Sequence, residues 1–356
     1  MRLLITGVCG FVGSTVALGL REGWPDWEIV GLDNFVRPGS ETNRARLKQR
    51  GVKLLHADIR NPSDLETIAQ CDWVLDGAAN PSVLAGVDGK TSSRQLLEHN
   101  LFGTINLLEL ARNWRAGFLM LSTSRVYSIR PLAAIPVRAD GDRFSPSIAK
   151  PHVPGLSEQG VAEDFPAEPP LSLYGSTKRA SEILALEYGE AFNLPVFINR
   201  CGVLAGPGQF GKIDQGIFSF WIHSWRARRP LKYIGFEGTG FQVRDCLHAG
   251  DLVPLLAKQI QKPPAEVPRI VNVSGGLGQS ASLKQLSAWC EQRLGWHDVA
   301  PNKEPRPFDV PWLVLDSSLA KQTWDWTPQT SLEATWNEIA NHAEANPNWL
   351  EFTADA

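Results

Sequence analysis

The sequence predicts a doubly wound α/β fold, in which helices cover both faces of a parallel sheet. Two observations lead to this prediction. Within the first 200 residues, short apolar runs alternate with longer amphipathic stretches, which is typical of strands joined by crossover helices. The runs are too short for helices, and short apolar runs indicate strands buried on both faces. A chain of 356 residues can bury such a core without disulfides or metals.

The individual elements follow from the same pattern. Gly, Asp, Asn or Pro bounds each apolar run, as expected at strand ends. The predicted strands span residues 3–6, 28–32, 52–56, 73–78, 118–122 and 196–199. The predicted helices between them span residues 13–22, 62–69, 92–114 and 172–192.

Residues 131–170 interrupt this pattern. Seven prolines between Pro136 and Pro170 predict that no regular element forms there, and the length of the stretch predicts a binding loop or lid. After Arg200 come Gly-rich turns, a short strand at 270–273 and nine of the thirteen tryptophans, which we expect to pack in a core. We therefore expect a sheet domain over 1–200 and a smaller, irregular lobe over 201–356 for a ligand, interwoven so that part of it returns to the sheet.

Composition excludes several classes of protein. With 35 basic and 38 acidic residues the formal charge is −3, so no global field attracts nucleic acid, and an anionic ligand has to be bound locally. Five cysteines without a CxxC pair and seven histidines without metal-ligand spacing predict neither disulfides nor a metal site. The N-terminus lacks a signal segment and no apolar run approaches the roughly 18 residues that span a bilayer. We expect a cytoplasmic protein that does not contact membranes.

A glycine-rich turn predicts a dinucleotide cofactor. The first strand is followed by a GxxGxxG turn formed by Gly7, Gly10 and Gly13, and such a turn lets a helix N-terminus approach a pyrophosphate. Asp33 ends the second strand twenty residues beyond Gly13, where its carboxylate accepts hydrogen bonds from ribose hydroxyls and repels a 2′-phosphate. NAD is therefore preferred to NADP as the cofactor, and residues 1–200 are expected to form the NAD-binding domain. The alternative is a Gly-rich turn and a surface Asp without a ligand.

Tyr174 and Lys178 form a YxxxK pair at i and i+4 on one helix face. A phenol is a weak base at neutral pH unless a cation favours the phenolate, and Lys178 is expected to supply that cation. An ordinary solvated helix pair is the alternative. Ser122, Thr123 and Ser124 end the fifth strand and offer three hydroxyls; Thr123 is expected to bind the reacting sugar oxygen against Tyr174.

These motifs together resemble the extended short-chain dehydrogenase/reductase family, specifically its NAD-dependent nucleotide-sugar epimerases and dehydratases. The resemblance covers nearly the whole chain and implies that Thr123, Tyr174 and Lys178 are catalytic. It implies a homodimer formed through helices 92–114 and 172–192. It also implies an NAD site that includes Tyr174 and Lys178 and is made of Gly7, Gly10, Phe11, Val12, Gly13, Asp33, Asn34, Asp58, Ile59, Ala78, Ala79 and Asn100.

Departures from the family pattern reduce the number of reactions that the chain is expected to catalyse. Dehydratases of the family carry an Asp-Glu pair directly after the catalytic Thr, whereas this chain has Ser124 and Arg125, so elimination of water is not expected. Segments 209–216 and 242–248 resemble those of CDP-sugar 2-epimerases. The implied reaction is transient removal and return of a hydride at a sugar carbon, with NAD retained.

The substrate would be a nucleotide-diphosphate sugar. Its expected contacts are Thr123, Ser124, Gln209, Asp214 and Arg244, the last because a guanidinium makes two parallel bonds to phosphate oxygens. For Arg244 the alternative is a structural ion pair with Asp245. A UDP-hexose 4-epimerase, a nucleotide-sugar reductase and a non-catalytic dinucleotide-sensing protein remain open as alternative functions.

Overall fold

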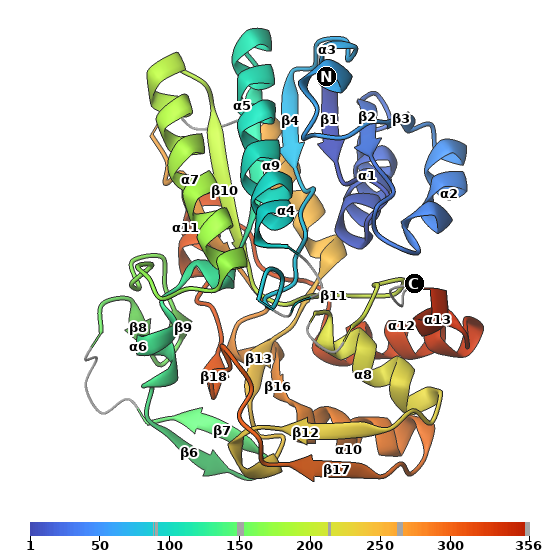
Figure 1. Ribbon diagram of the computed structural model, residues 1–356, viewed down its shortest axis with the longest axis vertical. Helices are drawn as coiled ribbons and strands as arrows, with labels where there is room; N and C mark the ends of the chain where they lie inside the picture. Colours follow the sequence, from blue (N-terminus) through green and yellow to red (C-terminus); the bar gives the residue numbers. More distant parts are fainter. Residues whose placement is uncertain (88, 90–91, 148–152, 213–214, 262–265, 353–356) are drawn as a thin grey trace.

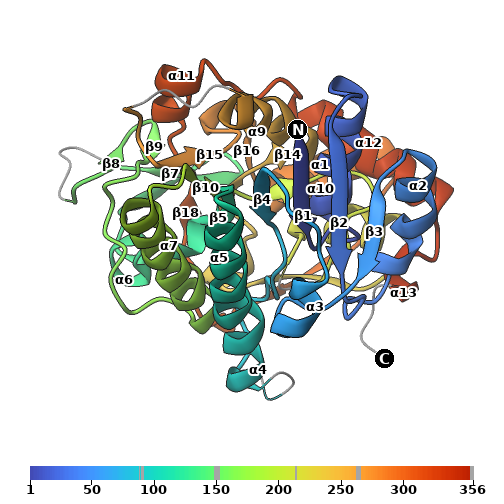
Figure 2. The same ribbon diagram turned by 90° about the horizontal axis from the view of Figure 1, so that it is seen from above.

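A seven-stranded parallel sheet forms the centre of the computed structural model, which describes residues 1–87, 89, 92–147, 153–212, 215–261 and 266–352. The strand order, visible in Figure 2, confirms the doubly wound fold. Every adjacent pair is parallel. From one edge to the other the strands are β15 (Ile270–Val273), β10 (Val196–Cys201), β5 (Gly117–Thr123), β4 (Trp73–Asp76), β1 (Arg2–Thr6), β2 (Glu28–Asp33) and β3 (Lys53–His56).

Helices cover both faces of this sheet (Figure 2). Side chains alternate along each strand, so that Leu3 and Ile5 belong to one apolar cluster and Leu4 to the other. The first cluster is covered by α1 (Phe11–Gly23), α9 (Leu252–Gln261) and α11 (Ser318–Trp324), and the second by α5 (Gly103–Trp114) and α7 (Leu173–Phe192). The smaller helices α2 (Asn43–Gln49) and α3 (Pro62–Glu66) adjoin the β2 and β3 side.

The order of the strands creates a crevice at the end of β1. From β1 the chain proceeds to β2 and β3 on one side, and β4 and β5 lie on the other. Ligands of doubly wound sheets bind at such a switch point, beyond the carboxyl ends of the strands. At this point the Thr6 hydroxyl accepts the backbone N–H groups of Gly77 and Ala78, at 3.2 and 3.1 Å. These bonds turn the chain away from the sheet, which is why β4 ends at Asp76 rather than at 78.

The helices differ from the prediction in three places. Helix α2 was not anticipated. The second predicted helix, 62–69, ends at Glu66. The long helix over 92–114 consists of α4 (Ser93–Leu97), a π-helical turn over Glu98–Phe102 and α5. Such wide turns are frequently found at functional sites, and this one contains the buried Asn100.

The prediction that residues 131–170 form no regular element is wrong. They contain most of α6 (Ile129–Ala133) and two antiparallel hairpins, β6 (Val137–Asp140) with β7 (Arg143–Pro146) and β8 (Leu156–Ser157) with β9 (Gly160–Val161). Among the described prolines of this stretch, the one inside a strand is Pro146, at the last position of β7, where proline is tolerated. Gly141 and Asp142 form the two-residue loop between β6 and β7, with Gly141 at φ +58°, and a Gly-Asp loop is a hairpin signal. A lid role for this stretch remains a prediction.

The remaining elements form the lower lobe in Figure 1. Seven of its nine tryptophans are buried, which confirms their expected role in packing; they are Trp221, Trp225, Trp312, Trp324, Trp326, Trp336 and Trp349. Its strands are β11 (Leu204–Ala205), β12 (Leu231–Ile234), β13 (Val243–Asp245), β14 (Leu247–His248), β16 (Ser280–Ser282), β17 (Val299–Asn302) and β18 (Trp312–Leu313). Its helices are α8 (Ile217–Arg226), α10 (Leu283–Leu294), α12 (Leu332–Ala345) and α13 (Trp349–Phe352). Short 3₁₀ turns span Ser40–Thr42, Ser124–Val126, Phe236–Gly238, Ala249–Asp251 and Leu277–Gln279.

Later parts of the chain return to the main sheet, because β15 pairs with β10 and both α9 and α11 pack on its face. Because segments on both sides of residue 200 contribute to the sheet, a domain boundary near that residue stays a prediction. Within the described ranges no helix combines the length and the apolarity needed to cross a bilayer. All five cysteines are buried free thiols.

Candidate active site

The glycine turn forms an open cradle at the crevice. Gly7 has φ +64°, and a Cβ there would lie 2.9 Å from the Cα of Ala78. A Cβ on Gly13 would lie 2.2 Å from the carbonyl oxygen of Gly7, so only glycine lets α1 pack this closely on β1. Gly10 is the N-cap of α1 and has no side chain to occupy the helix end. The helix N-terminus is thus available to a pyrophosphate, which fits the predicted cofactor.

Two predicted cofactor residues follow this turn. Phe11 begins α1 and is buried, with its ring beside Gly206, where a Cβ would lie 3.2 Å from the ring. Val12 packs partly against the core cluster on the same face of the sheet. Phe11 therefore links the cradle to the strand β11 of the lower lobe.

Asp33 closes the other side of the cradle. It is buried, and its two carboxylate oxygens accept the backbone N–H groups of Cys9 and Phe35, each at 2.8 Å. Burial raises the pKa of Asp33, although the backbone hydrogen bonds oppose the shift. These bonds tie the end of β2 to the glycine turn. Each oxygen keeps a further lone pair with which to accept a ribose hydroxyl.

A second group of predicted residues lines a small pocket of about 320 Å³ beside Asp33. Asn34 donates from Nδ2 to the carboxylate of Asp58 at 2.9 Å, and Arg60 binds the same carboxylate with a shortest distance of 2.7 Å. Burial acts against ionisation, but the hydrogen bonds from Arg60 and Asn34 hold the pKa of Asp58 well below its usual range. The position of the pocket after β2 and β3 fits the adenosine end of a dinucleotide.

Asn100 binds the backbone of the segment that follows β4. Its amide exchanges two hydrogen bonds with the backbone of Asn80, at 2.8 and 3.0 Å, and its Nδ2 also donates to Thr177 at 3.3 Å. It therefore holds the segment that includes Ala78 and Ala79 against α7. The remaining cofactor candidate, Ile59, is buried and packs against Gly103.

The predicted catalytic side chains meet where β5 ends. Ser172 caps α7 by accepting the N–H of Gly175 at 3.0 Å. A Cβ on Gly175 would lie 2.2 Å from the carbonyl oxygen of Arg125, so the absence of a side chain lets the start of α7 approach β5. Tyr174 is buried, and the Thr123 side chain lies beside its phenol, where it acts to lower the pKa of Tyr174.

Burial raises the pKa of Tyr174 to about 12; the Thr123 side chain and the charge of Arg125 only partly oppose this. The chain without its cofactor therefore keeps the phenol protonated at neutral pH. The role of Lys178 in favouring the phenolate stays a prediction. Lys178 is buried one turn further along α7. Burial raises the pKa of the neighbouring Asp76, and the charge of Lys178 opposes that shift.

A cavity of about 610 Å³ opens beside these residues, between the sheet and the lower lobe. Thr123, Ser124 and Tyr174 line it at the end of β5 and the start of α7. The charged side chains in its described lining are the cations Arg125, Lys232, Arg244 and Arg306 and the carboxylate of Asp309. Four positive charges against one negative leave an excess of three in a chain whose overall charge is −3. The cavity is thus suited to a polyanion.

Arg244 lies in this cavity. The alternative of an ion pair with Asp245 is not what the structure shows, because the carboxylate that contacts Arg244 is that of Asp309. The Nη2 of Arg244 is 2.7 Å from Asp309. Asp245 instead accepts the backbone N–H groups of Val203 and Leu315, at 3.0 and 2.9 Å. Asp245 therefore ties strands of the lobe together, and Asp309 orients the guanidinium of Arg244.

Of the two other predicted substrate contacts, Gln209 is not brought to the cavity and Asp214 cannot be placed in it or outside it. Gln209 donates from Nε2 to the carbonyl of Leu204 at 2.8 Å and lies beneath Gly216, where a Cβ would be 2.9 Å from its Cδ. It supports the loop before α8 and is absent from the cavity lining. Asp214 lies outside the described residues; its neighbour Gln215 lines the cavity.

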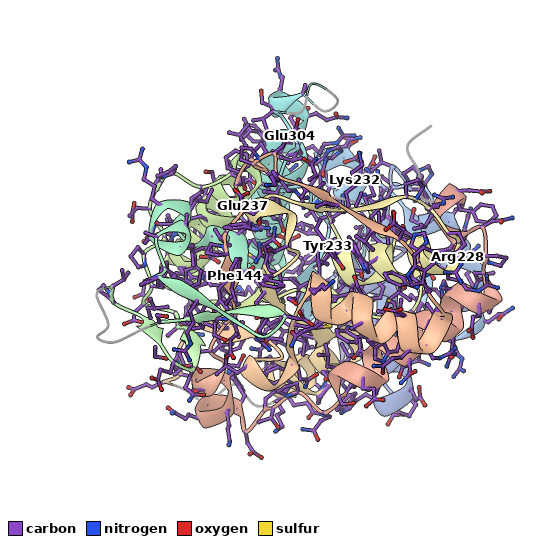
Figure 3. The ribbon with its side chains drawn as sticks, turned by 90° about the horizontal axis from the view of Figure 1, so that it is seen from below. Phe144, Arg228, Lys232, Tyr233, Glu237 and Glu304 are labelled. Carbon is purple, nitrogen blue, oxygen red and sulfur yellow. The ribbon has the colours of Figure 1, made fainter. Side chains whose placement is uncertain are left out.

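Sequence reasoning missed the cations and the carboxylate that complete the cavity. Lys232 lies on β12, which crosses the underside of the lobe beside Tyr233 (Figure 3). Arg306 and Asp309 come from an irregular proline-containing segment. Nothing in the sequence around Asp309 indicates that its partner is Arg244, because the two residues are 65 positions apart.

The fold and the site define a dinucleotide-binding α/β enzyme with a cavity for a polyanion. The chain matches the model of the NAD dependent epimerase/dehydratase family over residues 3–274, and it belongs to that family. The resemblance inferred from the motifs is confirmed, and NAD is the cofactor of this family.

Individual relatives point to nucleotide-sugar epimerases. The chain is 29% identical over 345 residues to CDP-paratose 2-epimerase from Salmonella typhi, covering 93% of this chain and 96% of that protein. It is 27% identical over 353 residues to UDP-glucuronate 4-epimerase from Thermodesulfobacterium geofontis, covering 96% of each. The crystal structure of UDP-glucuronic acid 4-epimerase from Bacillus cereus, in complex with UDP-glucuronic acid and NAD, has the same fold, with a TM-score of 0.77, 24% identity and coverage of 97% and 99%.

Asp33→Asn is expected to weaken NAD binding by roughly 10- to 100-fold, because one or two charge-assisted hydrogen bonds to ribose become neutral ones. The same change removes a negative charge that repels a 2′-phosphate, so the affinity ratio of NADP to NAD should rise. Calorimetry on protein freed of cofactor measures both, with the exposed Asp26→Asn as control. An unchanged NAD affinity would exclude Asp33 as a ribose contact.

Proposed function

We propose that the protein is an NAD-dependent nucleotide-sugar epimerase that inverts C2 of a CDP-sugar. The observation that carries this proposal is the composition of the 610 Å³ cavity, in which Tyr174 and Thr123 share one space with an excess of cations. A sugar hydroxyl at the pair and a diphosphate at the cations would be bound together. A site with cations alone could bind a nucleotide without reacting with it. The hydroxyl groups of Tyr174 and Thr123 add the means to transfer a proton.

Tyr174 would exchange a proton with the hydroxyl of the reacting carbon, while Thr123 holds the same oxygen by a hydrogen bond. Bound NAD would supply the acceptor and donor of the hydride and, in its oxidised form, a positive charge. Because burial raises the pKa of Tyr174 to about 12, a nearby positive charge is needed to ionise the phenol at neutral pH. Lys178, buried on the same helix, and Arg125, whose charge lowers the pKa of Tyr174, would add to the positive charge that favours the phenolate.

The absence of a carboxylate next to Thr123 favours epimerisation over elimination. Elimination of water needs an acid and a base beside the reacting carbons. Ser124 and Arg125 occupy the two positions after Thr123, and both line the cavity. Among the described lining residues the carboxylate is that of Asp309, which is held by Arg244. These residues support proton exchange at one carbon only.

CDP and C2 are supported by the similarity to CDP-paratose 2-epimerase over 93% of the chain. Inversion at C4 of a UDP-sugar is the second candidate, because a UDP-glucuronate 4-epimerase is 27% identical over 96% of the chain. Thermal shifts of the holoenzyme with CDP, UDP, GDP and dTDP separate the two. CDP is expected to give the largest stabilisation, by mass action on the folded state. A clear preference for UDP would replace the first candidate by the second.

We further propose a homodimer formed through the outer surfaces of α4, α5 and α7, which lie side by side on one face of the sheet (Figure 2). Apolar side chains are exposed there, and they would be buried by a second copy. Those on these helices and on the π-helical turn are Leu97, Phe102, Leu173, Ile183 and Phe192, 38–54% exposed. A symmetric pair of such helix faces is a self-complementary surface.

Ile183→Glu is expected to raise the dimer dissociation constant at least about 100-fold, since two like charges would face each other in an apolar interface. Light scattering after size exclusion should give the mass of two 39.2 kDa chains for the wild type and of one for the variant. Leu277→Glu, at an exposed leucine of the substrate lobe, should leave the dimer intact. A monomeric wild type would contradict the proposal.

A cytoplasmic location is also proposed. Its support is that all five cysteines are free thiols, as is usual in a reducing compartment. Fractionation of the source cells, with the protein followed by antibody, is expected to recover it in the cytoplasmic fraction; recovery outside it would overturn the assignment.

A further inference from the structure

Arg125 occupies an unusual position between the two ends of the cavity. It is the second residue after Thr123 and lines the same cavity as Tyr174. Its backbone N–H donates to the Thr123 side chain at 3.2 Å, and its carbonyl lies under Gly175 at the start of α7. The backbone of Arg125 is thus fixed from both sides by the elements that carry Thr123 and Tyr174. The guanidinium cannot move far from the reacting centre.

The side chain of Arg125 points toward the diphosphate end of the cavity. Its Nη1 donates to the carbonyl oxygen of Phe308 at 3.3 Å. Phe308 has φ +59°, a conformation that is rare for an aromatic residue, and it directly precedes the Asp309 that binds Arg244. Arg125 therefore contacts the segment that carries Asp309, and the charges of Arg125 and Arg244 are close enough to act on each other.

Among the described residues, the carboxylate whose charge acts on Arg125 is that of Asp309. Asp309, the nearby acid, makes its 2.7 Å contact with Arg244. Burial lowers the pKa of Arg125 to about 10, and the charge of Arg244 adds to the shift, while Asp309 opposes it. At neutral pH the side chain is still a cation. A cation held in this way, next to other cations, gains most from an anionic ligand.

We propose that Arg125 binds the sugar-linked phosphate of the substrate and thereby selects the ring carbon that reaches Tyr174. This inference rests on the proposed function and deepens it. C1 of the sugar carries the phosphate, C2 is bonded to C1, and C4 lies across the ring. A phosphate bound directly beside Tyr174 and Thr123 therefore presents C2 to them and keeps C4 away. Arg125 is in this sense a specificity-determining residue.

The test compares CDP with CMP, since CDP carries the phosphate in question and CMP lacks it. Calorimetry on the holoenzyme is expected to show that the wild type binds CDP about 10- to 100-fold more tightly than CMP, as one or two charge-assisted hydrogen bonds would give. Arg125→Met should lower this ratio about 10-fold, the part that one charge-assisted hydrogen bond supplies, and leave the affinity for CMP unchanged. Some preference for CDP should remain, because Lys232, Arg244 and Arg306 still line the cavity. Arg125→Lys, which keeps the charge without the two-pronged geometry, should retain part of the ratio. Arg130→Met, at an exposed arginine of α6, should retain all of it.

Two results would overturn the inference. One is a ratio that Arg125→Met and Arg125→Lys leave unchanged; the other is an equal loss of CDP and CMP affinity in a variant that unfolds at the wild-type temperature. The proposed substrate fails separately, if the wild type binds UDP and not CDP; the role of Arg125 is then decided by the same ratio measured with UDP and UMP. Binding of no nucleoside diphosphate by the wild type would overturn both.

Discussion

Replacing Tyr174 by Phe is expected to lower kcat by roughly 10²- to 10⁴-fold, the usual contribution of a positioned acid–base group. The substitution removes the phenol oxygen that lies beside Thr123 and keeps the buried ring. The unfolding temperature and the NAD content of the protein should therefore stay close to those of the wild type. The measurement is turnover of the CDP-sugar by the purified variant.

Tyr188→Phe is the matched control, because Tyr188 lies on the same helix and its hydroxyl binds Glu109 far from the cavity. It should retain wild-type turnover. If Tyr174→Phe also retained it, Tyr174 would not be the acid–base group, and the non-catalytic alternative would gain support.

The second large effect concerns stability. Glu182 of α7 and Arg200 of β10 form an ion pair at 2.8 Å, with side chains 0% and 3% exposed. Removing one partner of such a pair weakens the compensation of a buried charge. Arg200→Met would leave Glu182 with the partly exposed Arg179 at 3.2 Å, so the free energy of unfolding should fall by about 3 kcal/mol, the lower end for a broken buried pair. Urea unfolding of variant and wild type measures the difference.

An exposed pair on the same face of the sheet gives the comparison. Arg94 and Glu98 are 3.0 Å apart at i and i+4, and Arg94 is 89% exposed. Arg94→Met should cost less than about 0.5 kcal/mol. Equal losses in the two variants would show that the buried pair does not stabilise α7 against β10. Because Glu182 also accepts the hydroxyl of Ser122 at 2.6 Å, the pair supports the strand that ends at Thr123.

Local patterns were sufficient to predict the central sheet. Six of its seven strands are largely buried runs bounded by turn residues, and β3 is partly exposed. The cofactor turn follows β1 directly, so the strands and this turn could be predicted from neighbouring residues alone. The hairpin at β6 and β7 was not predicted, because the proline content of residues 131–170 was taken to exclude regular elements. Pro146 is tolerated at the last position of its strand.

The substrate cavity was only partly predictable, because its charges come from distant segments. Arg244 was expected to contact phosphate, but Asp309, which orients it, lies 65 residues later. Gln209 is polar and lies near α8 in sequence, yet its amide is used to hold the backbone at Leu204. Motif analysis gives the residue types of a site; which of them face the ligand depends on packing.

The most direct test of the account is the fate of the hydrogen on the inverted carbon. The enzyme would be incubated with CDP-paratose or another CDP-sugar in D₂O, and the product examined by NMR and mass spectrometry. Hydride removal and return predicts inversion at C2 with the original hydrogen retained there and no deuterium at that carbon. Deuterium at C2, or no inversion at any carbon, would contradict the account.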